Sequence, residues 1–425
     1  MHRPRTAMPA FAYATDHPAL LAHLLGRERL LIIQDLDGVC MDLVADPLTR
    51  RLELDYLHAA RRLAGEFFVL TNGEHIGSRG VNALVERSCG HLDPRAHRLY
   101  LPGLAAGGVQ FQSADGEVSH PGVSAAELQF LAQVPARARH WLATVLAEAP
   151  FALPAGQIAT LVDTCVLDNP VSPTLNLNLA FAALHAHPGR YALLQTRTAR
   201  WCQALLDSAT AAGLGESFFV HYAPNLGRDA HGERLKPAEG DSAGTTDFQI
   251  MLRGAVKEVG VLVLLNRYYH RLTGHHPLGA DFNARTAPTE RDRLLALAEA
   301  HFDPALMPTL MGVGDTLTAS TLDTGTVRGG SDRGFLTLVQ DLGVRFGSGN
   351  IVAFVDSSGG EIRRPRVATE HLPHAPARAL AGISDADDPL MLNAIFPGGY
   401  RQYLAFFAQL AARRAPGADW PTPPA

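Results

Sequence analysis

A short apolar run that ends in two aspartates constrains this chain more than any other feature. Residues 31–33 are Leu, Ile and Ile, and Asp35 and Asp37 follow them directly before Gly38. At the end of a parallel strand, residues two positions apart point the same way, so both carboxylates can face one substrate. Gly38 lets the backbone turn away from the strand. One carboxylate is then placed to attack a small electrophile while the other moves protons.

Two later apolar runs also end in polar residues that can carry chemistry. Residues 67–70 are Phe, Phe, Val and Leu and precede Thr71, and the run 310–314 precedes Asp315. An open α/β sheet binds its ligands at the edge where the carboxyl ends of its strands meet. Asp-x-Asp, Thr and Asp at three such strand ends are what a phosphoryl-transfer site needs.

An attacking carboxylate and a phosphoryl group repel each other, so such a site also needs a cation. Of the 37 Lys and Arg residues only Lys236 and Lys257 are lysines, and both lie between Thr71 and Asp315. Lys257 begins an apolar stretch that indicates a buried helix, so its amine is expected at a helix start facing the strand ends. Lys236 lies in a stretch typical of a loop, and we expect it to be a surface charge.

These four signals, in this order, resemble those of the haloacid dehalogenase-like hydrolase superfamily, mostly phosphatases that form an aspartyl-phosphate. The resemblance implies that Asp35 is the nucleophile and Asp37 the general acid and base. It implies that Thr71 hydrogen-bonds the phosphoryl oxygens and that Lys257 offsets their charge. It also implies a Mg²⁺ ion, whose expected ligands are Asp35, Asp37, Asp315 and Asp332.

The chain departs from the superfamily pattern at the second acid of the metal site. Phosphatases of the superfamily usually carry it four or five residues after the metal-binding Asp315, where this chain has Ala and Ser. The nearest later acids are Asp323 and Asp332. Asp332 precedes a stretch that indicates a helix, so it either supports the metal or opens that helix, where a negative charge is favoured.

The spacing of the motifs predicts an α/β protein: a doubly wound parallel-sheet (Rossmann-like) hydrolase core with a large inserted α/β cap. A core needs only a helix and a strand between Thr71 and Lys257, and the chain has far more there. We expect residues 1–118 and 250–425 to form the core and 119–249 the cap. The expected cap elements include strands at 157–165 and 191–195. Such a cap would close over the strand ends and exclude water.

Longer strings are similar to one family of the superfamily, the glucosylglycerol 3-phosphate phosphatases, which complete the synthesis of an osmoprotectant. The strings are residues 34–41, 166–178 and 328–335. The resemblance implies a Mg-dependent phosphatase for glucosylglycerol 3-phosphate, with glucosylglycerol-phosphate synthase as a candidate partner. Segment 166–178 also offers hydrogen-bonding groups for a glycoside. With Asn72, the residues expected to bind substrate are Asp168, Asn169, Ser172, Asn176 and Asn178, although each of the five also suits a turn or a helix cap.

Composition favours an enzyme of the cytoplasm. The net charge of −5 gives no basic surface for nucleic acid. No apolar run reaches the ~18 residues of a membrane span. The four cysteines form no Cys-x-x-Cys pair, which suits free thiols in a reducing compartment.

Three other functions stay open at this point. The chain could hydrolyse another sugar phosphate, such as sucrose phosphate or trehalose phosphate, or it could be a phosphomutase, which uses the same aspartate pair. It could also be a catalytically silent regulatory partner of a glycosyltransferase. The intact set of site residues argues against the silent partner, because a scaffold does not require it.

Overall fold

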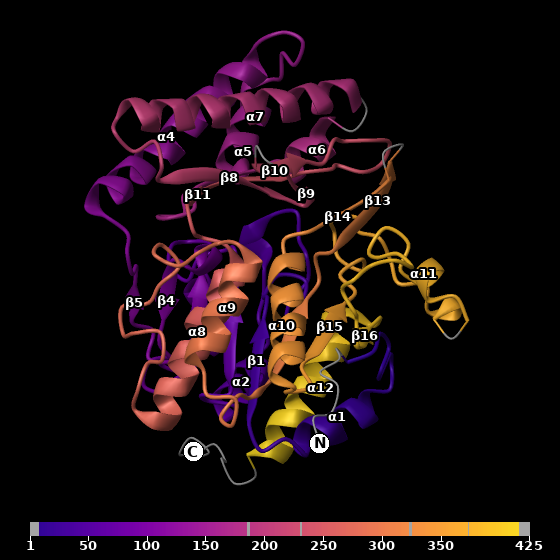
Figure 1. The fold of residues 1–425 in the computed structure, drawn as a ribbon. Helices are drawn as coiled ribbons and strands as arrows, with labels where there is room; N and C mark the ends of the chain where they lie inside the picture. Colours follow the sequence, from indigo (N-terminus) through magenta and orange to yellow (C-terminus); the bar gives the residue numbers. More distant parts are fainter. Residues whose placement is uncertain (1–7, 185–187, 230–231, 323–324, 373, 416–425) are drawn as a thin grey trace.

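The computed structural model describes residues 8–184, 188–229, 232–322, 325–372 and 374–415. Asp323, one of the two candidates for the second acid, lies outside the described residues. Two main sheets organise the chain: a large one in the lower part of Figure 1 and a smaller one beneath the helices at its top.

The larger sheet has eight strands in the order β16-β15-β12-β1-β2-β3-β4-β5. Neighbours are parallel from β16 to β3, whereas β3, β4 and β5 pair antiparallel at one edge. These strands are β1 Leu30–Gln34, β2 Phe67–Leu70, β3 Gly103–Ala105, β4 Gln110–Gln112, β5 Val118–Ser119, β12 Thr309–Gly314, β15 Ile351–Val355 and β16 Ala394–Phe396.

The three strands that precede the predicted site residues are neighbours in the middle of this sheet. Leu31 of β1 pairs with Leu310 of β12, and Ile32 pairs with Phe67 of β2. The carboxyl ends of β12, β1 and β2 therefore meet at one edge, where the sequence predicts the phosphoryl-transfer residues.

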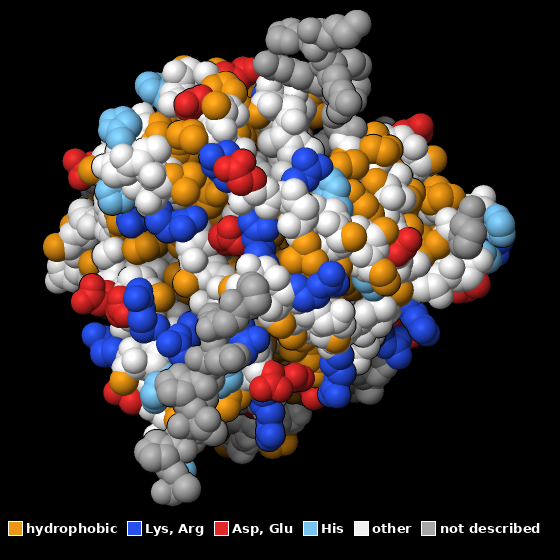
Figure 2. Space-filling model, turned by 90° about the horizontal axis from the view of Figure 1, so that it is seen from below, with side chains coloured by type: hydrophobic (Ala, Val, Ile, Leu, Met, Phe, Trp, Pro, Cys, Tyr) orange, Lys and Arg blue, Asp and Glu red, His pale blue; other side chains and the backbone are white. Residues whose placement is uncertain are grey.

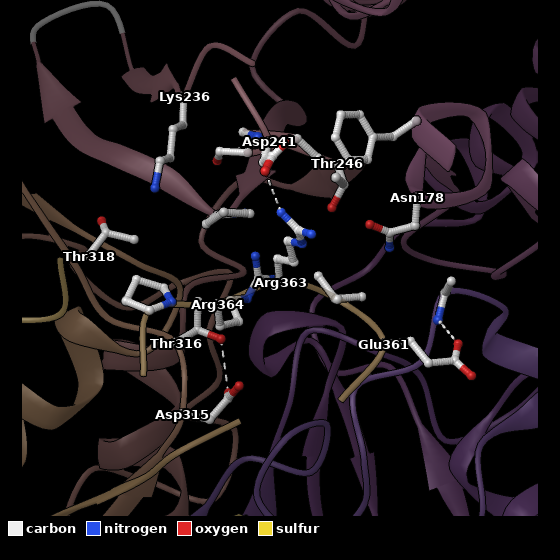
Figure 3. A pocket seen from close by; sticks show the side chains of 18 of the residues that line it. Asn178, Lys236, Asp241, Thr246, Asp315, Thr316, Thr318, Glu361, Arg363 and Arg364 are labelled. Atoms are coloured by element: carbon white, nitrogen blue, oxygen red, sulfur yellow. Dashed lines mark hydrogen bonds and ion pairs between the residues drawn. The ribbon is translucent and has the colours of Figure 1, made fainter. Parts of the chain in front are cut away.

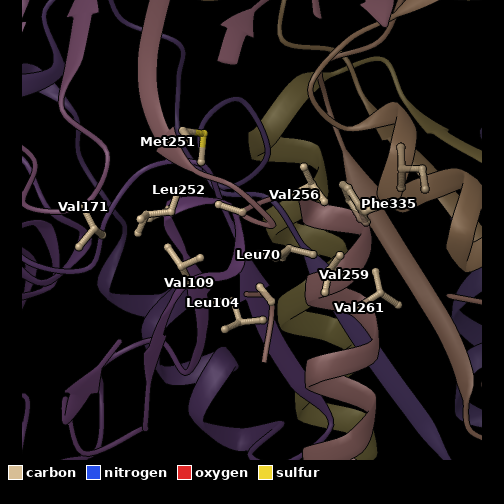
Figure 4. Packing of buried hydrophobic residues seen from close by; sticks show 14 of the residues in the cluster. Leu70, Leu104, Val109, Val171, Met251, Leu252, Val256, Val259, Val261 and Phe335 are labelled. Atoms are coloured by element: carbon tan, nitrogen blue, oxygen red, sulfur yellow. The ribbon is translucent and has the colours of Figure 1, made fainter. Parts of the chain in front are cut away.

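Helices cover both faces of the larger sheet. All of β1 is buried, with Leu31 and Ile33 in one hydrophobic cluster and Leu30 and Ile32 in the other. Figure 4 shows part of the first cluster, where Val259 lies near Leu70 and Phe335 lies near Val256. That face carries α8 Lys257–Thr273, α9 Arg291–His301 and α10 Arg333–Phe346, and the other carries α1 His17–Leu25, α2 Leu54–Arg62, α3 Val81–Cys89 and α12 Gly399–Arg414. The predicted α/β class with a doubly wound parallel sheet is confirmed.

The smaller sheet lies in the predicted cap and is antiparallel, in the order β6-β7-β11-β8. Helices pack on it on the side away from the core (Figure 1). The elements are α4 Ala125–Ala147, α5 Ala155–Cys165, β6 Val166–Leu167, β7 Thr174–Asn176, α6 Asn178–Leu184, α7 Pro188–Ala211, β8 Phe218–Ala223, the hairpin β9 Asn225–Asp229 with β10 Gly232–Leu235, and β11 Asp247–Leu252. Because β11 runs to Leu252, this sheet extends beyond the expected boundary at residue 249, and the division into domains stays a prediction.

Two predictions of secondary structure in the cap are wrong. Residues 157–165 lie in α5 and residues 191–195 lie in α7, so both expected strands are helical. The burial along α7 has the period of a helix, because its buried positions recur every three or four residues. Those positions are Tyr191, Leu194, Gln195, Thr198, Cys202, Leu205 and Ala209. A short apolar run read alone does not distinguish these two periods.

Two segments from the carboxyl-terminal half of the core are among those that contact the cap. The hairpin of β13 Thr318–Leu322 and β14 Gly325–Gly329 rises from the core toward β9 in Figure 1. There Thr318 Oγ1 donates to the Asn225 carbonyl oxygen at 3.0 Å. The segment after β15 reaches the cap through the ion pair of Arg363 and Asp241, at 2.7 Å.

Short helical turns and the surface complete the fold. The turns are η1 Pro47–Thr49, η2 Ala106–Gly108, η3 Thr369–His371 and α11 Pro376–Ala379. On the face that Figure 2 views from below, basic, acidic and hydrophobic side chains are interspersed. Among the helices of the described residues, none combines the length and the apolar character that a membrane crossing requires.

Candidate active site

Three buried carboxylates from three elements meet at the carboxyl edge of the larger sheet. Asp35 follows β1, Asp315 follows β12 and Asp332 is the N-cap of α10. Each offers an oxygen within 4.8 Å of the other two. The backbone holds the group together, because Asp332 Oδ2 accepts from the amides of Asp315 and Thr316, both at 2.9 Å. The structure thus brings Asp332 into the cluster, although the sequence left its role open.

Lys257 lies against two of these carboxylates. It is the first residue of α8, and its buried Nζ lies 2.7 Å from Asp35 Oδ2 and 2.7 Å from Asp332 Oδ1. Burial lowers the pKa of Lys257, but the carboxylates of Asp332 and Asp35 outweigh burial and raise it. The amine is therefore a fixed positive charge at the edge of the sheet, as the sequence predicts.

The cluster carries more negative charge than Lys257 can neutralise. Burial raises the pKa of Asp35 to about 7, against the effect of Lys257. Burial and the charges of Asp332 and Asp35 raise the pKa of Asp315 well above its usual value. Asp315 Oδ2 is buried without a hydrogen-bond partner. Carboxylate oxygens at this spacing are the ligands that Mg²⁺ prefers, so the residues fit a divalent cation.

Gly38 leaves room for this carboxylate. Its φ is +76°, and a Cβ built there would lie 2.2 Å from Asp315 Oδ2. A side chain at position 38 would therefore collide with the candidate metal ligand, so the turn after β1 needs glycine for both its conformation and its space.

The side chain of Asp37 lies apart from the acidic cluster. Arg50 Nη1 donates to both of its carboxylate oxygens, at 3.3 and 3.1 Å. Arg50 also donates to the carbonyl oxygens of Pro47 and Arg79. The Asp37 carboxylate is thus held beside the cluster and remains about one-third exposed, where a proton can reach it. Its carbonyl oxygen stays a predicted metal ligand.

Thr71 and Asn72 follow β2 and face the same small cavity. The cavity measures about 140 Å³ and has Asp35, Asp37, Thr71 and Asn72 in its wall. Thr71 Oγ1 accepts from the Gly73 amide at 3.2 Å. The Asn72 amide nitrogen lies 2.8 Å from His221 Nε2 in β8, so this core residue contacts the predicted cap.

The predicted substrate residues of segment 166–178 divide into two groups. Asn169, Asn176 and Asn178 line the small cavity, and the Asn178 Nδ2 is buried without a partner. Ser172 is fully buried and donates from Oγ to Glu74 at 2.9 Å. Asp168 contacts Arg79 at 3.4 Å. All five stay predictions as substrate ligands, and the first three have the geometry for it.

Glu74 anchors this segment, and sequence reasoning missed it. Its Oε1 accepts from the amides of Val171 and Ser172, at 2.8 and 2.6 Å, and from the Ser172 hydroxyl. Burial raises the pKa of Glu74 to about 7. Glu74 lies three positions after Thr71, close enough to a predicted site residue that it could have been considered.

A larger cavity of about 590 Å³ adjoins the small one between core and cap (Figure 3). Asn178, Asp315, Thr316, Ile362 and Arg364 line both cavities. The larger cavity also has Lys236, Phe181 and Thr246 from the cap in its wall. The expectation that Lys236 is a surface charge is therefore wrong, because its side chain is partly buried in this wall.

Arg364 is a further site residue that sequence reasoning missed. It belongs to the segment between β15 and β16, and its Nε is buried without a hydrogen-bond partner. Burial lowers its pKa, and the charges of Asp315 and Asp247 oppose that effect. Asp247 comes from β11 and accepts from Asn176 Nδ2 at 2.7 Å. No motif of the sequence indicates Arg364, because the long segment that carries it has no regular period.

An acidic cluster, a buried lysine and a cavity lie together at the carboxyl edge of a doubly wound sheet, an arrangement that suits an α/β hydrolase of phosphoric monoesters. Comparison with known proteins agrees. A sequence model described as glucosylglycerol-phosphate phosphatase matches residues 29–411. A glucosylglycerol-phosphate phosphatase of Synechocystis sp. (strain ATCC 27184 / PCC 6803 / Kazusa) is 51% identical over 409 residues, which cover 95% of this chain and 97% of that protein. The chain belongs to the glucosylglycerol-phosphate phosphatase family and is a phosphoric monoester hydrolase.

Two solved structures are also similar to this chain, each at 10% identity. One is a trehalose-6-phosphate phosphatase of Aspergillus fumigatus, with a TM-score of 0.38. The other is the C-terminal domain of the trehalose-6-phosphate phosphatase of C. albicans, with a TM-score of 0.45. Each likeness covers 94% of this chain and 98% of the other.

Proposed function

We propose that this protein hydrolyses glucosylglycerol 3-phosphate to glucosylglycerol and phosphate through an aspartyl-phosphate on Asp35. The observation that carries the proposal is the position of Lys257, 2.7 Å from Asp35 and from Asp332, where Asp35 lines the smaller of two adjoining cavities. The larger cavity, at about 590 Å³, is of the size that holds a small ligand. The family supports the choice of substrate.

In the first step Asp35 attacks phosphorus, and the bond from phosphorus to the ester oxygen of the glycerol part breaks. Lys257 reduces the repulsion between the carboxylate and the phosphoryl oxygens, an electrostatic role of the kind that often contributes most to catalysis. Thr71 donates its hydroxyl hydrogen to a phosphoryl oxygen. Asp37 donates a proton to the departing alkoxide, so glucosylglycerol leaves as a neutral alcohol.

In the second step water attacks the phosphorus of the aspartyl-phosphate, and the phosphorus–Asp35 bond breaks. Asp37, now a carboxylate, takes a proton from that water. Phosphate leaves and Asp35 returns to its starting form. Glu74 of the core holds cap segment 171–172 by hydrogen bonds. The cap therefore restricts the access of other water molecules to the intermediate.

The three clustered carboxylates support a proposed Mg²⁺ cofactor. When bound, Mg²⁺ would supply positive charge for the phosphoryl oxygens and offset the charge of Asp35, Asp315 and Asp332. The unpartnered Asp315 Oδ2 supports this assignment, because a buried carboxylate oxygen without a donor is costly.

The test is phosphate release by the purified protein from a set of sugar phosphates, with Mg²⁺ and with chelator. We expect the highest kcat/KM with glucosylglycerol 3-phosphate and no turnover with chelator. Faster release from sucrose 6-phosphate or trehalose 6-phosphate would replace the substrate. An absence of release from every phosphate ester would favour a silent regulatory partner, and isomerised sugar phosphate without free phosphate would favour a mutase.

The biological setting of the reaction is also a proposal. We infer that the product serves as an osmoprotectant and that the enzyme acts in the cytoplasm after glucosylglycerol-phosphate synthase. The name of the Synechocystis relative supports the substrate on which this setting depends. The four cysteines are free and buried, as expected for a protein of a reducing compartment.

A further inference from the structure

Lys236 stands out because this chain almost never uses lysine. Thirty-five of its 37 basic residues are arginines, and one of the two lysines is Lys257 in the candidate active site. The other, Lys236, follows β10 and lines the larger cavity, whose wall also contains Asp315. Both lysines of the chain therefore lie in or beside the proposed active site.

The backbone fixes the position of Lys236. Its amide donates to Thr245 Oγ1 at 2.9 Å, and its carbonyl oxygen accepts from the Thr245 amide at 2.8 Å. Gln195 Nε2 donates to the same carbonyl oxygen at 3.2 Å. The side chain then extends into the cavity toward the core in Figure 3. The backbone at Lys236 therefore needs no further ordering when the side chain binds a ligand.

The ammonium group of Lys236 has no partner that would explain its position. Within the described residues, no carboxylate lies within ion-pair distance of its Nζ, whereas Arg363 in the same wall is paired with Asp241 at 2.7 Å. Burial and the like charge of Arg364 both lower the pKa of Lys236. A partly buried donor facing another cation is stabilised when an electron-rich ligand lies between them.

The other residues of the cavity wall indicate the chemical class of that ligand. Phe181, Ala182 and Leu317 provide apolar surface, and Thr246 and Asn178 provide hydrogen-bonding groups. Apolar faces with a ring of hydroxyl oxygens are the features of a glycoside. An ammonium is a compact point charge with three donors, which suits several hydroxyl oxygens better than the planar fork of arginine does.

We propose that Lys236 binds hydroxyl oxygens of the glycoside part of the substrate and so determines specificity. The proposal rests on the proposed function, because it assumes that the ester at Asp35 carries a glycoside. It assigns Lys236 to the leaving group, while Lys257 remains the cation of the phosphoryl group. Loss of Lys236 is therefore expected to weaken binding of the natural substrate and to spare an ester that lacks the glycoside.

The test compares Lys236→Met and Lys236→Gln with Arg234→Met, which removes the same charge from an exposed position of β10. Kinetics are measured with glucosylglycerol 3-phosphate and with p-nitrophenyl phosphate. We expect both Lys236 variants to lower kcat/KM for the glycoside ester about 10- to 100-fold, mainly through KM. With the aryl ester both should stay within about twofold of the unsubstituted protein. The inhibition constant of free glucosylglycerol should rise by the same factor as KM.

Each other outcome has a distinct meaning. Equal losses on both esters in both variants would overturn the proposal, because they would place Lys236 at the phosphoryl group or in the folding of the cap. Unchanged kinetics with the glycoside ester would also overturn it, as would an equal loss in Arg234→Met. If the unsubstituted protein did not hydrolyse glucosylglycerol 3-phosphate at all, the proposed function would fail instead. Lys236 would then be tested on the ester that is hydrolysed.

Discussion

Asp332→Asn should lower stability strongly and Asp315→Asn should leave it almost unchanged, although both should abolish activity. Asp332 accepts on both oxygens: Oδ1 from Lys257 at 2.7 Å, and Oδ2 from the amides of Asp315 and Thr316. Asparagine has one acceptor oxygen, so its NH₂ group must face either the ammonium or two amides. Asp315 instead accepts on Oδ1 from Thr316 at 2.9 Å and has no partner on Oδ2. Asparagine fits there without losing a bond.

The magnitudes follow from these contacts. Removing one partner of a buried ion pair costs about 3–5 kcal/mol, and two hydrogen bonds to a charged acceptor are worth a similar amount. Asp332→Asn should therefore lower the free energy of unfolding by about 3 kcal/mol in chelator. Asp315→Asn should change it by less than about 1 kcal/mol, because no bond is lost and a buried charge is removed.

Urea unfolding in chelator and in Mg²⁺, together with phosphate release, measures both effects. Mg²⁺ at 100 times its dissociation constant should stabilise the unsubstituted protein by about 2.7 kcal/mol. Asp315→Asn should lose that increment while keeping its stability in chelator. The reasoning is refuted if Asp332→Asn is as stable as the unsubstituted protein in chelator. It is also refuted if Mg²⁺ stabilises Asp315→Asn as before.

Three further predictions concern other parts of the site. Asp35→Asn should abolish turnover without unfolding, whereas Asp37→Asn should accumulate a phosphoenzyme visible in intact-protein mass spectra; substantial turnover by Asp35→Asn would contradict the nucleophile. Arg364→Ala should lower kcat/KM at least about tenfold for both ester types, because its charge faces Asp315 at the junction of the cavities; steady-state kinetics that match the unsubstituted protein would contradict this role. Burial raises the pKa of Glu74 from 4.5 to about 7, so its contribution to stability is present below pH 4.5 and lost as the pH rises through 7. Melting temperatures of Glu74→Gln should lack that part of the pH dependence, and identical profiles would contradict it.

Local patterns explain why much of the site could be predicted from the sequence. An apolar run fixes a buried strand, and the residue after it falls at the carboxyl edge of a parallel sheet whatever the rest of the chain does. Asp35, Thr71 and Asp315 lie at that edge for this reason. Lys257 was predicted because the apolar stretch after it indicates α8, and the structure places its ammonium beside Asp35.

Contacts between distant segments explain why other residues could not be predicted. Asp332 lies 17 positions beyond Asp315 and joins the cluster because the β13–β14 hairpin returns the chain to the sheet edge. Arg364 comes from the segment after β15, and Glu74 acts on residues 97 and 98 positions later in the cap. Such positions depend on how the core and the cap dock, and no local pattern in a single sequence indicates that docking.

The docking of the cap also bears on how substrate enters the proposed active site. The Arg363–Asp241 pair has side chains 74% and 71% exposed, so it contributes little stability. The bonds of Glu74 to segment 171–172 are buried, and each is worth more because its acceptor is a buried carboxyl group. The Arg363–Asp241 pair should therefore separate at lower cost than the contacts at Glu74 or the buried Thr318–Asn225 hydrogen bond. Because the larger cavity lies between core and cap at the Arg363 side, the glycoside would enter there while Glu74 keeps segment 171–172 attached to the core.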